Sequence, residues 1–266
     1  MAFVERLDAA IERAGSLLCV GLDPDGFEDA AAAERFCLET MEAALPYACA
    51  VKPNLAFFEQ LGSAGYAVLE RLRGHLPAER LLILDGKRGD IGSTAQAYAR
   101  ALFEVYGADA VTVNPLMGED SVRPWLDWEG RGVFLLARTS NPGAADLLEL
   151  RLDGGQPVYA RIAELAQRWD AGGGAVGLVI GATAPDAVAA LRAQAPALPF
   201  LLPGVGAQGG SLEDAVRAGL DARGGGLLLP LSRGIAAAPE GARAAAAGLR
   251  ERIAAVRAAA ATAQAP

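Results

Sequence analysis

Residues 81–90 read LLILDGKRGD, four apolar residues followed by charged residues and glycines. An uninterrupted apolar run of this kind is typical of a strand that is buried on both faces of a parallel sheet. Asp85 and Lys87 stand two residues apart, so their side chains leave the same face of such a strand. The stretch therefore predicts a buried strand whose carboxyl end presents paired opposite charges.

The same pattern recurs along the chain at intervals of about 20 to 45 residues. The apolar runs end in or close to Gly, Pro, Asn or Asp, and the segment that follows each run is rich in Ala, Leu, Arg and Glu, as helices are. Strands that alternate with helices form a parallel sheet. Eight such strands are predicted: Leu17–Asp23, Cys49–Asn54, Leu81–Lys87, Ala110–Pro115, Val133–Thr139, Ala175–Ala182, Phe200–Gly206 and Gly226–Ser232. Eight units in a chain of this length predict a closed (β/α)₈ TIM barrel rather than an open α/β sheet.

Length and composition agree with one large domain. The chain has 266 residues, of which 52% are hydrophobic and 21% charged, so it can bury a sizeable core and is neither disordered nor fibrous. No segment reads as a linker, and we expect a single barrel over residues 1–266. The Ala-rich end predicts a final helix that frays over residues 261–266.

The charge pattern bears on partners and location. A formal net charge of −8 repels nucleic acid and anionic membranes, so we expect neither as a partner. The longest apolar runs are too short to span a membrane, and the first residues carry acids where a secretory signal is basic. These features predict a cytoplasmic protein.

The thiols and the imidazole offer little chemistry. Cys19, Cys37 and Cys49 are odd in number and have no CxxC spacing, which predicts buried free thiols. The one histidine, His75, lies in a polar stretch, which is typical of a surface position at a helix end. A Ser/His/Asp triad or a multi-histidine metal site is therefore not expected.

Charged and amide side chains stand at the predicted strand ends, which meet at one rim of a barrel of this type. Lys52 ends the second strand, and Asp90 follows Asp85 and Lys87 in the turn after the third. An ion pair at the rim would explain Asp85 and Lys87 by themselves. A second lysine favours a functional site, because such an array is costly to assemble unless its charges are paired. An ammonium held beside carboxylates can stabilise a carbanion and protonate it.

A phosphate site is predicted at the last two strand ends. The seventh loop reads PGVGAQGG at residues 203–210, and the eighth strand ends in Ser-Arg-Gly with Arg233 at its centre. A tight turn explains the glycines equally well. Together with a guanidinium at the neighbouring strand end, they favour backbone and side-chain donors around a phosphate.

These motifs resemble the orotidine 5′-phosphate decarboxylase family, in the bacterial subgroup whose third strand reads close to DAKRGDIGST. Here residues 85–94 read DGKRGDIGST. The resemblance spans about residues 16 to 240 in the same order. It includes GLDPD at 21–25, VKPNLAFFE at 51–59, VNPLMG at 113–118, RTSNPGA at 138–144, PGVGAQGG at 203–210 and SRGI at 232–235.

The resemblance implies a cofactor-independent and metal-independent decarboxylase that converts orotidine 5′-monophosphate to uridine 5′-monophosphate and carbon dioxide in pyrimidine biosynthesis. It implies an alternating tetrad of Lys52, Asp85, Lys87 and Asp90, in which Lys87 protonates C6 of the pyrimidine. It also implies a homodimer in which Asp90 belongs to the partner's site.

Binding roles follow from the same resemblance. It assigns Asp23 and Thr94 to the ribose hydroxyls, with Thr94 reaching across the dimer interface, and Ser140 to the pyrimidine. The phosphate falls to the loop that begins at Pro203, where Gln208 lies, and to Arg233.

Three positions depart from the family pattern. Gly86 replaces the usual alanine, Ser211 stands where an acid is common, and Pro230 falls within the last strand. We expect Gly86 to loosen the backbone between Asp85 and Lys87, and Pro230 to interrupt the strand by removing a ladder donor.

Three alternatives remain open at this point. The first is a magnesium-dependent enzyme of the same superfamily that acts on a sugar phosphate. Such enzymes share a DxKxxD third strand but typically carry a carboxylate where this chain has Lys52, and a lysine repels the cation. The second is a nucleotide-binding barrel without catalysis. The third, a barrel enzyme of aromatic amino-acid synthesis, would need a different third strand.

Overall fold

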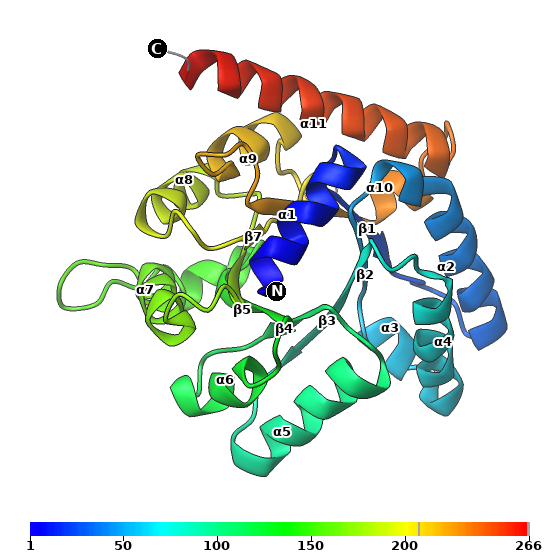
Figure 1. The fold of residues 1–266 in the computed structure, drawn as a ribbon, viewed down its shortest axis with the longest axis horizontal. Helices are drawn as coiled ribbons and strands as arrows, with labels where there is room; N and C mark the ends of the chain where they lie inside the picture. Colours follow the sequence, from blue (N-terminus) through cyan, green and yellow to red (C-terminus); the bar gives the residue numbers. More distant parts are fainter. Residues whose placement is uncertain (207, 265–266) are drawn as a thin grey trace.

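The computed structural model describes residues 1–206 and 208–264. Its eight parallel strands pair in sequence order and β8 pairs back to β1, so the barrel is closed (Figure 1). The strands are β1 (Leu18–Leu22), β2 (Ala50–Pro53), β3 (Leu81–Arg88), β4 (Ala110–Val113), β5 (Gly132–Arg138), β6 (Val176–Ile180), β7 (Phe200–Leu201) and β8 (Leu227–Leu231). The predicted (β/α)₈ barrel is confirmed.

Helices surround the strands in the order that the sequence predicts (Figure 1). The α-helices are α1 (Phe3–Ala14), α2 (Ala30–Ala44), α3 (Ala56–Glu59), α4 (Gly62–His75), α5 (Gly92–Arg100), α6 (Glu119–Leu126), α7 (Val158–Asp170), α8 (Pro185–Gln194), α9 (Leu212–Gly219), α10 (Arg233–Ala236) and α11 (Ala242–Gln264). Three short helical segments of other types are η1 (Leu45–Tyr47), η2 (Ala101–Val105) and η3 (Pro142–Asp146). None of the helices in the described part of the chain has the length and apolar character of a membrane span.

The end of the chain continues the last helix. We expected fraying over residues 261–266, and α11 runs on to Gln264. Residues 265 and 266 lie outside the described residues.

At the other end of the chain, α1 lies across the amino-terminal end of the barrel, where the ring of Phe3 packs edge-on against Phe134 of β5.

Strand β7 is much shorter than the predicted 200–206. Its pairing with β6 and with β8 ends at Leu201. Pro203 faces β6, where its carbonyl accepts from the Ala182 N–H, but it has no N–H to donate on that side, and the backbone then turns through positive φ at Gly204 and Gly206. The N–H of Leu202 still donates to the Leu228 carbonyl at 2.9 Å. The extra length becomes a loop at the carboxyl end of the barrel.

Pro230 does not interrupt β8, contrary to the sequence-based expectation. The strand continues through Pro230 to Leu231, and Pro230 stands in register with Cys19 of β1. The preceding N–H, that of Leu229, donates toward β1, so the proline nitrogen faces the β7 side. The pairing of β8 with β7 ends at Leu228 and Leu201, so the donor that Pro230 lacks falls where this pairing ends.

A buried carboxylate fastens α1 to the barrel. Asp109, just before β4, is 1% exposed and accepts hydrogen bonds from Arg6 of α1 at 2.5 Å and from the Leu82 N–H at 2.9 Å. Arg73 and Arg131 each approach it to 3.3 Å. Three guanidinium groups therefore compensate one buried charge at the amino-terminal end of the barrel.

The thiols and the histidine lie as the sequence predicts. Cys19, Cys37 and Cys49 are buried and free. His75 is exposed in the last turn of α4. None of these four residues lines the cavity at the carboxyl ends of the strands.

Candidate active site

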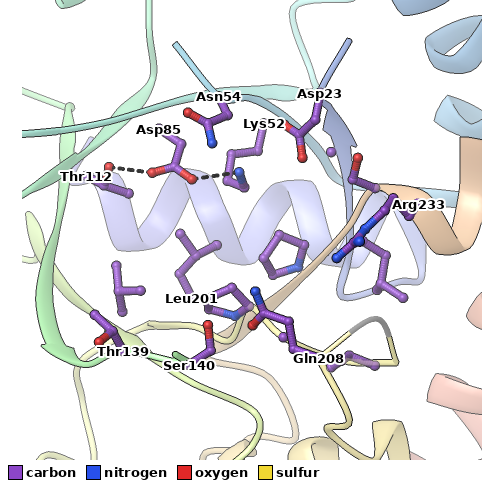
Figure 2. A pocket seen from close by; sticks show the side chains of 18 of the residues that line it. Asp23, Lys52, Asn54, Asp85, Thr112, Thr139, Ser140, Leu201, Gln208 and Arg233 are labelled. Carbon is purple, nitrogen blue, oxygen red and sulfur yellow. Dashed lines mark hydrogen bonds and ion pairs between the residues drawn. The ribbon is translucent and has the colours of Figure 1, made fainter. Parts of the chain in front are cut away.

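A cavity of about 400 Å³ opens at the carboxyl ends of the strands. Figure 2 shows the side chains that point into it from several strand ends and from the loops that follow. Eight of the ten predicted site residues line it: Asp23, Lys52, Asp85, Lys87, Ser140, Pro203, Gln208 and Arg233. The closure of the barrel thus brings together residues from almost the whole sequence.

Asp85 forms the centre of a charged array in this cavity. Its Oδ2 accepts a hydrogen bond from Lys52 Nζ at 2.8 Å, and its Oδ1 accepts one from Lys87 Nζ at 2.7 Å. The side chains of Lys52 and Asp85 are only 8% and 11% exposed, whereas that of Lys87 is 47% exposed. Lys87 is therefore the lysine of the array that a bound molecule can reach most readily.

The array sets the charge states of its members. Burial opposes the ammonium form of Lys52, but the nearby carboxylates of Asp85 and Asp23 outweigh it and raise the Lys52 pKa. Burial likewise opposes the ionised form of Asp85, yet Lys52 and Lys87 hold its pKa well below the usual range. At neutral pH Asp85 is therefore ionised and Lys52 is protonated.

Asp23 has an unpartnered oxygen beside this array. Its Oδ1 is buried and has no hydrogen-bond partner among the described residues. Asn54, at the end of β2, lies near Asp85 and Lys52 at the same side of the cavity (Figure 2). A buried acceptor without a partner is costly, so Asp23 is suited to a donor on a ligand, such as a hydroxyl group.

Arg233 and Gln208 lie across the cavity from Asp85 (Figure 2). Gly204 holds a φ of +100°, and a Cβ there would stand 2.8 Å from Gln208 Oε1 and 3.0 Å from the Ser140 Cβ. The glycine therefore lets the two loops that carry Gln208 and Ser140 approach each other. This side offers a guanidinium and an amide to an anion. Ala207 of the same loop motif lies outside the described residues.

Asp90 and Thr94 do not line the cavity of their own chain. The Asp90 carboxylate accepts the N–H of Ile91 at 2.8 Å, and Thr94 is exposed on α5. Large apolar side chains are exposed around them and in the loop after β4: Ile91, Tyr98, Leu116 and Met117. The segment after β3 therefore presents two polar side chains within an apolar surface.

Thr112 is a further site residue, which the sequence motifs did not predict. This β4 residue lines the cavity, is buried, and donates to Asp85 Oδ1 at 2.8 Å. A signal was available, because the strand reads AVTV and Thr112 is its one polar residue. Thr139 and Asn141 also line the cavity, where the Thr139 hydroxyl lies 2.7 Å from Asn141 Oδ1.

The two other departures have local explanations. A Cβ on Gly86 would stand 2.6 Å from Leu55 Cδ1, so the glycine makes room for a buried leucine beside the array. Ser211 is the N-cap of α9, and its hydroxyl accepts the Asp214 N–H at 3.2 Å.

Comparisons with known proteins agree with one another. Residues 16–247 match the model of the orotidine 5′-phosphate decarboxylase / HUMPS family. The chain is 48% identical over 255 residues to the orotidine 5′-phosphate decarboxylase of Roseiflexus castenholzii, with 93% of each chain covered. It is 46% identical over 271 residues to that of Thermomicrobium roseum, covering 97% of this chain and 96% of the relative. The structure of Leishmania donovani OMP decarboxylase is similar with a TM-score of 0.90 and 45% identity, covering 97% of this chain and 99% of that one.

Proposed function

The chain belongs to the orotidine 5′-phosphate decarboxylase / HUMPS family, and we propose that its Lys52–Asp85–Lys87 array carries out the decarboxylation of orotidine 5′-monophosphate. The protein is a decarboxylase of pyrimidine biosynthesis, as the names of relatives at 46–48% identity over most of the chain indicate. The observation that supports the assignment of the array is its geometry: two lysines on the two oxygens of one buried carboxylate, beside a cavity with Arg233 at its far side.

The proposed decarboxylation needs positive charge to stabilise a carbanion at C6 and a proton to quench it. The bond from C6 to the carboxylate carbon breaks, its electron pair stays on C6, and carbon dioxide leaves. No conjugated group of the ring accepts that electron pair, so fixed cationic charge must stabilise the carbanion. The exposed ammonium of Lys87 supplies the charge and then the proton, which gives uridine 5′-monophosphate and a neutral lysine that regains a proton from water.

Asp85 has two roles in this proposal. Its carboxylate holds both ammonium groups in place, and it stands near the substrate carboxylate that departs. Like-charge proximity then favours loss of carbon dioxide, which relieves the repulsion.

The binding roles follow the layout of the cavity. Arg233 and Gln208, in the loops after β8 and β7, hold the phosphate, and Asp23 accepts from a ribose hydroxyl with its unpartnered Oδ1. Ser140 contacts the pyrimidine between these ends, and Pro203 begins the loop that encloses the phosphate. Binding energy from the remote phosphate is thereby available to the transition state.

A homodimer completes the site in this proposal. Asp90 and Thr94 lie outside their own cavity, within a surface where Leu116 is 73% and Ile91 49% exposed. An exposed apolar surface of this kind marks an interface. A second copy placed on it carries Asp90 into the array and Thr94 toward the ribose of the neighbouring site.

We place this enzyme in the cytoplasm, which the three free thiols support.

The test is decarboxylation of orotidine 5′-monophosphate by the purified protein, followed by ultraviolet absorbance with and without chelator, beside Lys87→Ala. We expect turnover that chelator leaves unchanged and that falls by at least about 10³-fold in the variant, which should still bind uridine 5′-monophosphate. Loss of activity with chelator would favour the magnesium-dependent alternative. Product binding without turnover in the wild type would favour a non-catalytic nucleotide-binding barrel.

A further inference from the structure

The backbone of Lys87 has an unusual conformation for its residue type. Its φ is +47°, in the left-handed region that residues other than glycine rarely adopt. The pairing of β3 with β4 slips at this point, between Leu84 and Arg88. A slip of this kind leaves a strand residue without its regular ladder partner.

A side chain of β4 replaces the missing partner. The Lys87 N–H donates to the Thr112 Oγ1 at 2.9 Å, and Thr112 is 1% exposed, so water does not compete for this contact. The hydroxyl thus stabilises the conformation that turns the Lys87 side chain back toward Asp85.

The same hydroxyl also contacts the carboxylate. Thr112 Oγ1 donates to Asp85 Oδ1 at 2.8 Å, and that oxygen is the one that accepts from Lys87 Nζ. Because the hydroxyl accepts from a backbone N–H, its single proton is left for Asp85. The carboxylate is consequently fixed in rotation, with Oδ1 toward Lys87 and Oδ2 toward Lys52.

We propose that Thr112 is a positioning residue of the decarboxylase, which fixes the Lys87 backbone and the Asp85 carboxylate through one hydroxyl group. The inference rests on the proposed function and adds a residue to it. Thr112 takes no part in the chemistry itself. Its hydroxyl acts through two groups whose placement decides whether the ammonium lies over C6.

The variant that separates this role from packing is Thr112→Val, which keeps the shape of the side chain and removes the hydroxyl. Thr112→Ser keeps the hydroxyl and removes a methyl group. Thr40, a buried threonine of α2 outside the cavity, provides the matched control Thr40→Val. Thr112→Ala is a second hydroxyl-free variant in case the valine variant folds poorly.

We expect Thr112→Val and Thr112→Ala to lower kcat by about 10- to 100-fold with KM and the Kd for uridine 5′-monophosphate within about threefold of wild type. Thr112→Ser should stay within about threefold of wild type in both constants, and Thr40→Val should match wild type. The Lys87 amide should exchange with solvent faster in the two hydroxyl-free variants. If Thr112 had a merely structural role, the hydroxyl-free variants would not lose kcat selectively at unchanged KM, and Thr112→Ser would not keep the kcat of the wild type.

Three results would overturn the inference. A kcat of Thr112→Val within twofold of wild type would show that the hydroxyl does not matter. Equal losses in Thr112→Ser and Thr112→Val would assign the effect to the methyl group. A wild-type chain without decarboxylase activity would reject the proposed function and this inference with it, whereas the first two results leave the proposed function standing.

Discussion

Asp90 follows Lys87 by only three residues, yet the two side chains do not enter the same cavity of one chain. Lys87 lines the cavity and bonds Asp85, while the Asp90 carboxylate accepts the N–H of Ile91 outside it. The backbone turn after β3 separates them. If both act in one site, as we propose, the aspartate must come from a second copy of the chain.

Mixed dimers test this arrangement. We expect Asp90→Asn and Lys87→Ala each to be nearly inactive by itself, because each homodimer has two damaged sites. After mixing and exchange of subunits, about half of the dimers are hybrids with one intact site out of two, so about a quarter of wild-type activity should return. The measurement is turnover of the mixture over time. If activity does not return although subunit exchange is demonstrated, the aspartate does not act across an interface.

Arg233→Ala tests the proposed phosphate site. Because binding energy from a remote group is used at the transition state, we expect kcat/KM to fall by about 10²-fold or more, and by more than the affinity for uridine 5′-monophosphate falls. Arg233→Lys keeps the positive charge but lacks the planar guanidinium group. Its kcat/KM should lie between that of the wild type and that of the alanine variant. Unchanged kinetics in the alanine variant would refute the phosphate assignment.

Asp109→Asn tests the charge cluster at the opposite end of the barrel. The variant leaves Arg6, Arg73 and Arg131 without their shared carboxylate, and we expect a loss of about 3 kcal/mol in the free energy of unfolding. Urea denaturation measures it, and kcat/KM of the folded variant should not change. Glu213→Gln breaks an exposed pair with Arg252 and should cost less than about 1 kcal/mol. Equal losses in the two variants would contradict the interpretation.

The buried thiols predict a decline of stability in alkali. Burial raises the pKa of Cys37 and Cys49 to about 12 and that of Cys19 well above its ordinary value, whereas thiols of the unfolded chain titrate near about 8.5. Above that pH the unfolded state loses protons that the folded state retains. Each thiol therefore lowers the free energy of unfolding by about 1.4 kcal/mol per pH unit until its folded pKa is reached.

Urea denaturation at pH 8, 9 and 10 measures this decline. Tyrosine and lysine side chains also titrate in alkali, so the comparison is with Cys37→Ala, which should show a shallower decline by the share of one thiol. Parallel curves for the two proteins would contradict the prediction, whatever the absolute stability of the variant.

Features that depend on local sequence patterns could be predicted, and features that depend on contacts between distant residues could not. The barrel could be predicted because every strand is a local apolar run, and the placement of Lys52 and Asp85 follows because strand ends meet at one rim. The length of β7 could not be predicted. Its pairing ends at Leu201, just before the backbone turns at Pro203 and Gly204, and not at the end of the predicted strand.

Residues whose roles depend on register were harder to find. The contact of Thr112 with Lys87 requires the slip between β3 and β4, which no local pattern of the sequence reveals. The partners of Asp109 come from three distant segments and meet only in the folded chain. The placement of Asp90 in a partner's site stays a prediction.

The seam between β1 and β8 joins opposite ends of the sequence, with Cys19 in register with Pro230. Asp23 follows one of these strands and Arg233 the other, so the sides of the cavity that we propose for the ribose and for the phosphate become neighbours only when this seam forms. Contacts between such distant segments are slow to form, because a large loop entropy opposes them. A partly folded chain therefore has no complete nucleotide pocket, and nucleotide stabilises only the finished barrel. During refolding, we therefore expect nucleotide binding to appear only once β1 and β8 have paired.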